Sequence, residues 1–174
     1  MATVTYYGTL HLYVGDDDER AARNQTIIQK LKEDNGPNLS RITIDGGNPN
    51  GLECFLDLAS LGNLIGRSTQ LVELIFDRFG GNVLNSLINN SFCAGMNKNE
   101  SIECIRFSNI RLNDGKFFTA LLPFFENNNN LVKIVLSGNH DGSSARIARA
   151  LSRCNNSGTF LVVLVHRDVQ FFWL

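Results

Sequence analysis

The chain has 174 residues, enough for one domain with a sizeable core. Its 16 lysines and arginines against 17 aspartates and glutamates leave a formal charge of -1, which argues against a surface that holds a nucleic-acid backbone. The longest apolar run, residues 160–165, is far too short to cross a bilayer and no secretion signal opens the chain, so we expect a monomeric protein of the cytoplasm or nucleus that binds no membrane.

Six short segments carry apolar residues at their first, fourth and sixth positions, and the alternation of positions 4 and 6 is typical of β-strands. These triplets are Tyr7/Leu10/Leu12, Leu39/Ile42/Ile44, Leu71/Leu74/Phe76, Ile102/Ile105/Phe107, Leu131/Ile134/Leu136 and Phe160/Val163/Val165. They begin at residues 7, 39, 71, 102, 131 and 160, so consecutive units are 32, 32, 31, 29 and 29 residues apart. We predict strands near residues 7–13, 39–45, 71–77, 102–108, 131–137 and 160–166.

A stretch with helical spacing follows each predicted strand except the last. The apolar residues that would face the core are Ile27, Ile28 and Leu31; Phe55, Leu58, Leu61 and Ile65; Val83, Leu84, Leu87 and Ile88; Phe117, Leu121 and Phe125; and Ile147, Ala150 and Leu151. The acidic run 16–19 suits the start of the first of these helices. We expect residues 93–100 to form a polar loop, and Pro123 to kink or shorten the fourth helix.

The repeat pattern is clearest in two units. It reads Leu131-x-x-Ile134-x-Leu136-x-x-Asn139 with Gly142 and Leu151, and Ile102-x-x-Ile105-x-Phe107-x-x-Ile110-x-Leu112 with Gly115 and Leu122. This resembles the leucine-rich repeat family, in its ribonuclease-inhibitor-like subclass of about 28 to 29 residues per unit. The chain departs from the family where Asn139 stands, since the other units have Gly15, Gly47, Phe79, Ile110 and Asp168 there.

The resemblance implies an α/β fold, a leucine-rich-repeat solenoid that forms a segment of a horseshoe. Its parallel sheet would line the concave side and its helices the convex side. Residues 1–174 would form a single domain of about six degenerate strand-helix units. The sixth unit has no helix after its strand, which indicates either a small cap or a piece cut from a longer array.

If positions 1, 4 and 6 of each strand point inward, positions 3, 5 and 7 face the concave side. The resemblance implies that this surface binds a protein partner. The residues we expect to contact it are Arg41, Asp45, Glu73, Asp77, Arg106, Lys133 and His166. Arg41 beside Glu73 would also suit an ordinary pair on a solvated face, whereas Asp45 beside Asp77 sets like charges together, which a basic partner or a cation would relieve.

No group of residues in the sequence predicts catalysis, a cofactor or a metal ion. His11, His140 and His166 belong to distant units or a turn, and the four cysteines lack zinc-site spacing and are expected to be reduced and mostly buried. The sequence therefore favours a protein-protein interaction module rather than an enzyme. The alternative is a regulator of an enzyme, such as an activator of small GTPases of the leucine-rich-repeat type, acting through the turn residues Arg111, Asn113 or Asn139.

Overall fold

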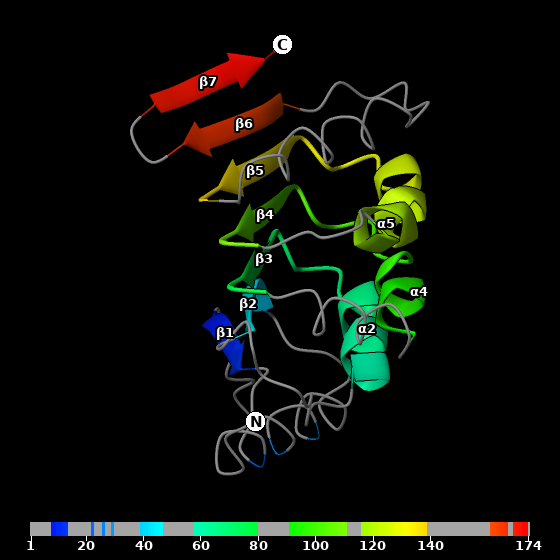
Figure 1. Ribbon diagram of the computed structural model, residues 1–174. Helices are drawn as coiled ribbons and strands as arrows, with labels where there is room; N and C mark the ends of the chain where they lie inside the picture. The colour runs from blue at the N-terminus through cyan, green and yellow to red at the C-terminus, as the bar shows by residue number, and fades with distance from the viewer. Residues whose placement is uncertain are drawn as a thin grey trace.

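Strands form where the apolar triplets predict them, and consecutive strands are parallel neighbours (Figure 1). The computed structural model describes residues 8–13, 22, 26, 29, 39–46, 58–79, 91–110, 116–138, 161–166 and 169–173. Strands β1 to β6 are Gly8–Tyr13, Leu39–Asp45, Glu73–Asp77, Cys104–Ser108, Lys133–Ser137 and Leu161–His166. Each pairs in parallel with the next, so the chain returns to the same end of the sheet after every strand. The predicted α/β fold with a parallel sheet is confirmed.

The helices of the described part lie together on one side of the sheet (Figure 1). They are α2 (Leu58–Arg67), α4 (Phe92–Met96) and α5 (Lys116–Asn127). Among the residues that the structure describes, none of the helices has the length and apolar character that a membrane span requires.

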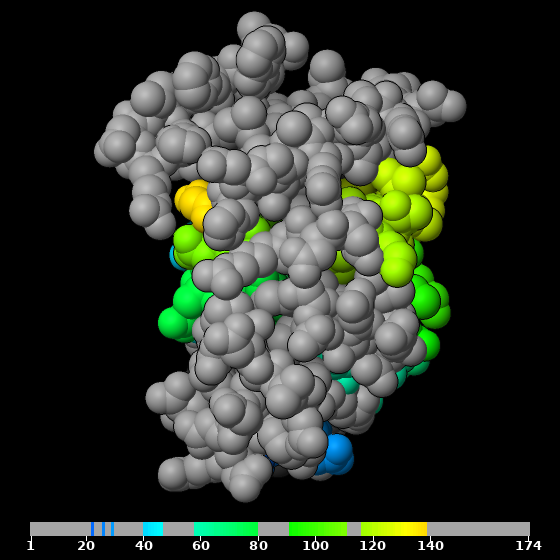
Figure 2. All heavy atoms as spheres, viewed as in Figure 1, coloured from blue at the N-terminus to red at the C-terminus, as the bar shows by residue number. Residues whose placement is uncertain are grey.

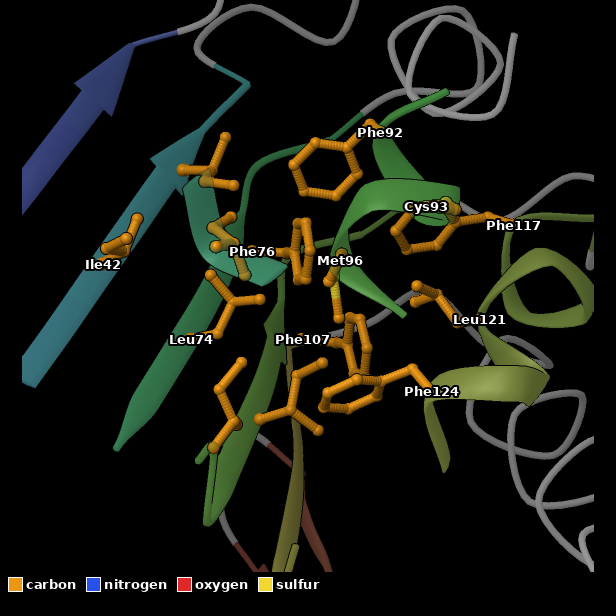
Figure 3. Close-up of a cluster of buried hydrophobic side chains, with 14 of the residues drawn as sticks. Ile42, Leu74, Phe76, Phe92, Cys93, Met96, Phe107, Phe117, Leu121 and Phe124 are labelled. Atoms are coloured by element: carbon orange, nitrogen blue, oxygen red, sulfur yellow. The ribbon is translucent and has the colours of Figure 1, made fainter. Parts of the chain in front are cut away.

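Two rows of apolar side chains cross the helix-facing side of the sheet, because residues in register on neighbouring strands share a face. The rows are Ile42, Leu74, Ile105 and Ile134, and Ile44, Phe76, Phe107 and Leu136, all at most 1% exposed. Figure 3 shows Phe76 and Phe107 in the space between the sheet and the helices, close to residues of α4 and α5. The predicted inward positions 4 and 6 are confirmed for these four strands.

Aromatic rings fill the centre of this core. The rings of Phe76 and Phe107 stack with centroids 5.4 Å apart and planes 7° from parallel. Phe117 of α5 meets both edge-on, at 5.5 Å and 6.3 Å. Phe92 of α4 also meets Phe76 edge-on, at 6.0 Å, so two repeat units and two helices share one aromatic cluster.

The polar loop predicted for residues 93–100 is wrong at its start, because helix α4 occupies residues 92–96. Phe92, Cys93 and Met96 lie at positions i, i+1 and i+4 and are buried. That spacing gives even this short helix one apolar side, which packs against the sheet.

Glycines bring α4 against α2. A Cβ atom on Gly62 would collide with the backbone carbonyl of Phe92, and one on Gly66 would collide with the carbonyl of Gly95. A Cβ on Gly95 would lie 2.5 Å from the carbonyl carbon of Gly62. The two helices therefore touch backbone to backbone, which no residue with a side chain would permit at these positions.

Helix α5 continues through Pro123 to Asn127, so the expectation that the proline shortens it is wrong. Pro123 is exposed, whereas Phe124 and Phe125 are buried directly after it. Burial of aromatic residues on both sides of Pro123 offsets the backbone hydrogen bond that its ring cannot donate.

Buried asparagines close two of the turns that lead from a helix into the next strand. Ser68, Asn99 and Asn128 each stand three residues before a unit's first apolar position, and both asparagines are 1% exposed. The Asn99 Nδ2 donates to the carbonyls of Ile65 (2.7 Å) and Ser68 (2.9 Å), while its Oδ1 accepts from the Ile102 N–H (2.9 Å). The Asn128 Nδ2 donates to the Ile102 carbonyl at 3.1 Å. These amides bond each turn to the preceding unit.

Strand β6 pairs with β5 one residue away from the predicted register. Ile134 pairs with Val162, whereas the apolar triplets align it with Val163. The run 160–165 is apolar at every position, so it lacks the alternation that would fix which residues face the core.

A seventh strand, β7 (Val169–Trp173), pairs antiparallel with β6 at the end of the sheet, and the sequence analysis did not predict it. Phe171, Phe172 and Trp173 are residue types that favour strands. Two residues separate β6 from β7, a connection that suits a hairpin and not a further parallel repeat.

Candidate functional site

The face of the sheet opposite the helices, called the outer face below, is formed by the third, fifth and seventh residues of the units in β2 to β5. These are Arg41, Thr43 and Asp45; Glu73, Ile75 and Asp77; Cys104, Arg106 and Ser108; and Lys133, Val135 and Ser137. In the space-filling view, residues of β3, β4 and β5 reach the surface one above another, on the side away from α4 and α5 (Figure 2). The strands thus set equivalent outer residues in rows that cross the sheet, with neighbours in a row about 4.8 Å apart.

Glu73 connects two arginines across three strands. Its Oε2 lies 2.5 Å from the Arg41 Nε on β2, and its Oε1 lies 3.6 Å from an Arg106 guanidinium nitrogen on β4. The side chain of Glu73 is 13% exposed, whereas Arg41 is 51% and Arg106 37% exposed. The predicted Arg41–Glu73 pair is confirmed, and both guanidinium groups remain accessible from solvent.

Asp45 and Asp77 are in register, as predicted, but they do not form an unrelieved pair of like charges. Asp45 is 1% exposed, and both of its oxygens accept from Arg78, with the Arg78 Nε 3.0 Å from Oδ1. The same Nε lies 3.7 Å from Asp77. The expectation that Asp45 is available to a partner is wrong, because an arginine of this chain covers and neutralises it.

A second donor satisfies Asp77. The Asn109 Nδ2 donates to the Asp77 Oδ1 at 2.9 Å. Arg78 and Asn109 are equivalent in the repeat, each directly after a strand, and both have left-handed backbones with φ of 56° and 53°. Arg78, which follows β3, thereby reaches Asp45 at the end of β2. Asn109, which follows β4, reaches Asp77 at the end of β3. Neither residue was predicted from the sequence, although their place directly after the strand ends at residues 77 and 108 could have indicated them.

Cys104 lies on the outer face beside Glu73, with its Sγ 3.9 Å from the Glu73 Oε1. Burial and the Glu73 carboxylate raise the pKa of this thiol, and Arg106 and Lys133 act in the opposite direction. Cys93, on the helix-facing side, has its pKa raised by burial to about 12. Both thiols are free, as predicted, but Cys104 is only partly buried.

The outer face changes character towards β5. Lys133 is exposed, while Val135 is 2% exposed although it stands on the outer face. Val135 pairs with Val163, and Ser137 with Val165. His166, expected in the same set, pairs instead with Val169 of β7, so the change of register removes it from the predicted row.

The described part of the chain brings together no set of three histidine, cysteine, aspartate or glutamate side chains that could hold a metal ion. The residues proposed for a GTPase regulator, Arg111, Asn113 and Asn139, lie outside the described residues, as do His140 and the acidic run 16–19. The site that the structure presents is therefore a surface of exposed cations and partly buried carboxylates, suited to binding.

The sequence matches no protein-family model, and searches of curated proteins and of solved structures found no similar protein.

Proposed function

We propose that the chain is a leucine-rich-repeat solenoid segment of the ribonuclease-inhibitor-like type, with the outer face on its concave side. In this proposal the outer face binds a protein partner and the chain catalyses no reaction. Support comes from the repeated register, in which equivalent residues of β2 to β5 pair with one another. The asparagine turns at equivalent places in two units support it too.

The observation that carries the binding role is the set of accessible cations on the outer face. Arg41, Arg106 and Lys133 project from three different strands at fixed register, and none of them is needed to fill the core. Surface cations with such fixed spacing can recognise a partner at small cost in ordering, because the strands already hold their Cα atoms in place.

Site-specific photocrosslinking tests this role. A benzophenone amino acid placed at Lys133 should crosslink a protein partner in cells that express the chain, since this position lies on the outer face. The same amino acid at Lys98, an exposed residue after α4, serves as the matched control. Adducts from Lys98 alone, or equal adducts from both positions, would show that the outer face is not the binding surface.

A further inference from the structure

We infer that the partner segment recognised by the outer face is an extended acidic stretch of protein that crosses β2 to β5. This inference rests on the proposed function and names the chemistry of its partner. It replaces the basic partner that the paired aspartates had suggested, because those aspartates are bonded within the chain.

The charges at positions 3 and 5 of the units carry the inference. In β2 to β5 these positions hold Arg41, Arg106 and Lys133 against the single carboxylate of Glu73, and three cations against one anion leave a formal charge of +2. The whole chain has a formal charge of -1. Positions 3 and 5 are therefore more positive than the chain as a whole, and an acidic partner would be complementary to them.

The neighbouring strands add no charge to these rows. The residues in register with them are Thr9 and His11 on β1, and Leu161 and Val163 on β6. None of these carries a formal charge at pH 7 with histidine neutral. The positive patch is thus bounded on both sides along the sheet.

The other two carboxylates of the outer face lie at the opposite end of the strands. Asp45 and Asp77 are the seventh residues of their units, at the carboxyl ends of β2 and β3, where Arg78 and Asn109 bond them. The surface is consequently positive at positions 3 and 5, whereas the two aspartates at position 7 together with Arg78 leave a formal charge of -1. An acidic segment would therefore bind across the amino-terminal half of the strands, where positions 3 and 5 lie.

The spacing of the cations suits an extended chain. Arg41 and Lys133 occupy the same row with β3 and β4 between them, which puts their Cα atoms roughly 14 Å apart at about 4.8 Å per strand. An extended peptide covers about 13–14 Å in four residues, and its alternate side chains share one face. Carboxylates four residues apart, which share that face, could then meet Arg41 and Lys133, while Arg106 lies between them in the next row.

Selection of displayed random 12-residue peptides on the full chain tests the inference without assuming a partner. We expect the enriched peptides to carry aspartate and glutamate well above their frequency in the library. A synthetic copy of an enriched peptide should bind more weakly as salt is raised, because screening weakens contacts between exposed charges.

Two variants of equal charge change locate the contact. Lys133→Glu on the outer face should weaken binding of this peptide about tenfold, while Lys98→Glu on the helix side should leave it unchanged. Glu73→Gln should tighten binding several-fold, because it removes the one carboxylate that competes for Arg41 and Arg106. Circular dichroism of each variant establishes that it is folded.

The outcomes separate the two proposals. Peptides that lack acidic enrichment but lose affinity in Lys133→Glu would overturn the acidic partner and leave the outer face as a binding surface. Peptides insensitive to Lys133→Glu would overturn both. Failure to enrich any peptide, or tighter binding of a dT12 oligonucleotide than of the selected peptide, would overturn the inference of an acidic protein segment.

Discussion

The two faces of β2 to β5 are made by the same strands, residue by residue in alternation, yet they are subject to different constraints. On the helix-facing side all eight side chains at positions 4 and 6 are apolar and at most 1% exposed. On the outer face the side chains range from Asp45, at 1% exposed, to the exposed Lys133. The packing of apolar side chains limits which residues the helix-facing side accepts, whereas charge dominates the interactions of the outer face. Substitutions on the first should lower stability, and most substitutions on the second should alter binding.

The largest expected difference between the faces is at adjacent residues of β4. Phe107→Ala should lower the free energy of unfolding by about 3–5 kcal/mol, the usual cost of removing a buried aromatic ring. Arg106→Ala, one residue earlier on the outer face, should cost less than about 1 kcal/mol. Urea denaturation measures both. Equal losses would contradict the assignment of the two residues to opposite faces.

A buried polar residue on the helix side should be almost as sensitive as the core, because its bonds are all made inside the protein. Asn99→Asp keeps the shape but turns the donor that faces the Ile65 and Ser68 carbonyls into an oxygen. We expect a loss of about 2–3 kcal/mol at pH 7. The control is Asn130→Asp, whose exposed Nδ2 donates only to the Glu100 carbonyl and which should change little. Similar thermal shifts for both variants would show that burial of Asn99 is unimportant.

The helix-facing side could be predicted from the sequence far better than the outer face. A repeat of 29 to 32 residues and alternating apolar positions are enough to place the strands and to align Ile42, Leu74, Ile105 and Ile134. The same reasoning misplaced β6 by one residue because its run of apolar residues has no alternation. It also missed α4, a five-residue helix with an internal glycine that forms because packing against α2 outweighs low propensity.

The outer face was harder to predict because its aspartates are bonded by residues whose backbone is left-handed, Arg78 and Asn109. Arg78 reaches Asp45 from a left-handed conformation that costs an arginine about 1–2 kcal/mol. The repeat contains a usable signal nevertheless. A hydrogen-bond donor stands directly after a strand where the neighbouring earlier strand ends in aspartate. Arg78 follows β3 and bonds Asp45 of β2, and Asn109 follows β4 and bonds Asp77 of β3. Glycine stands directly after β2 and β5, as Gly46 and Gly138, where the neighbouring earlier strands end in Tyr13 and Ser108.

A double-mutant cycle measures how strongly the pairing of Asp45 with Arg78 stabilises the protein. Arg78→Gly removes the left-handed strain but leaves the Asp45 carboxylate buried without its arginine, so we expect a net loss of about 1–2 kcal/mol. Asp45→Ser combined with Arg78→Gly recreates the combination found at Ser108 and Gly138 and should restore stability to within about 1 kcal/mol of the wild type. Additive losses in the double variant would mean that Arg78 acts mainly through other contacts.

The smallest effect expected concerns the two thiols, which report on the two faces separately. Burial raises the pKa of Cys93 from 9.0 to about 12, so at pH 8 only about one thiol in 10⁴ is the reactive thiolate. Iodoacetamide should therefore label Cys104 before Cys93, as mass spectrometry can assign. Glu73 raises the pKa of Cys104, so Glu73→Gln should lower that pKa and enlarge the thiolate fraction. The labelling of Cys104 should then be faster, with Cys93 unchanged.

The exposed Glu103, beside Cys104 in sequence, provides the control for that experiment, since Glu103→Gln removes the same charge without touching the contact between Glu73 and the Cys104 Sγ. Faster labelling of Cys93 and Cys104 together would report opening of the whole fold rather than a local change of charge. Above about pH 9 the unfolded chain ionises Cys93 while the folded protein keeps the thiol protonated up to about pH 12, so the protein should become less stable as pH rises from about 9 towards 12. That loss should be insensitive to Glu73→Gln, since the carboxylate acts on the outer face and Cys93 lies behind the sheet.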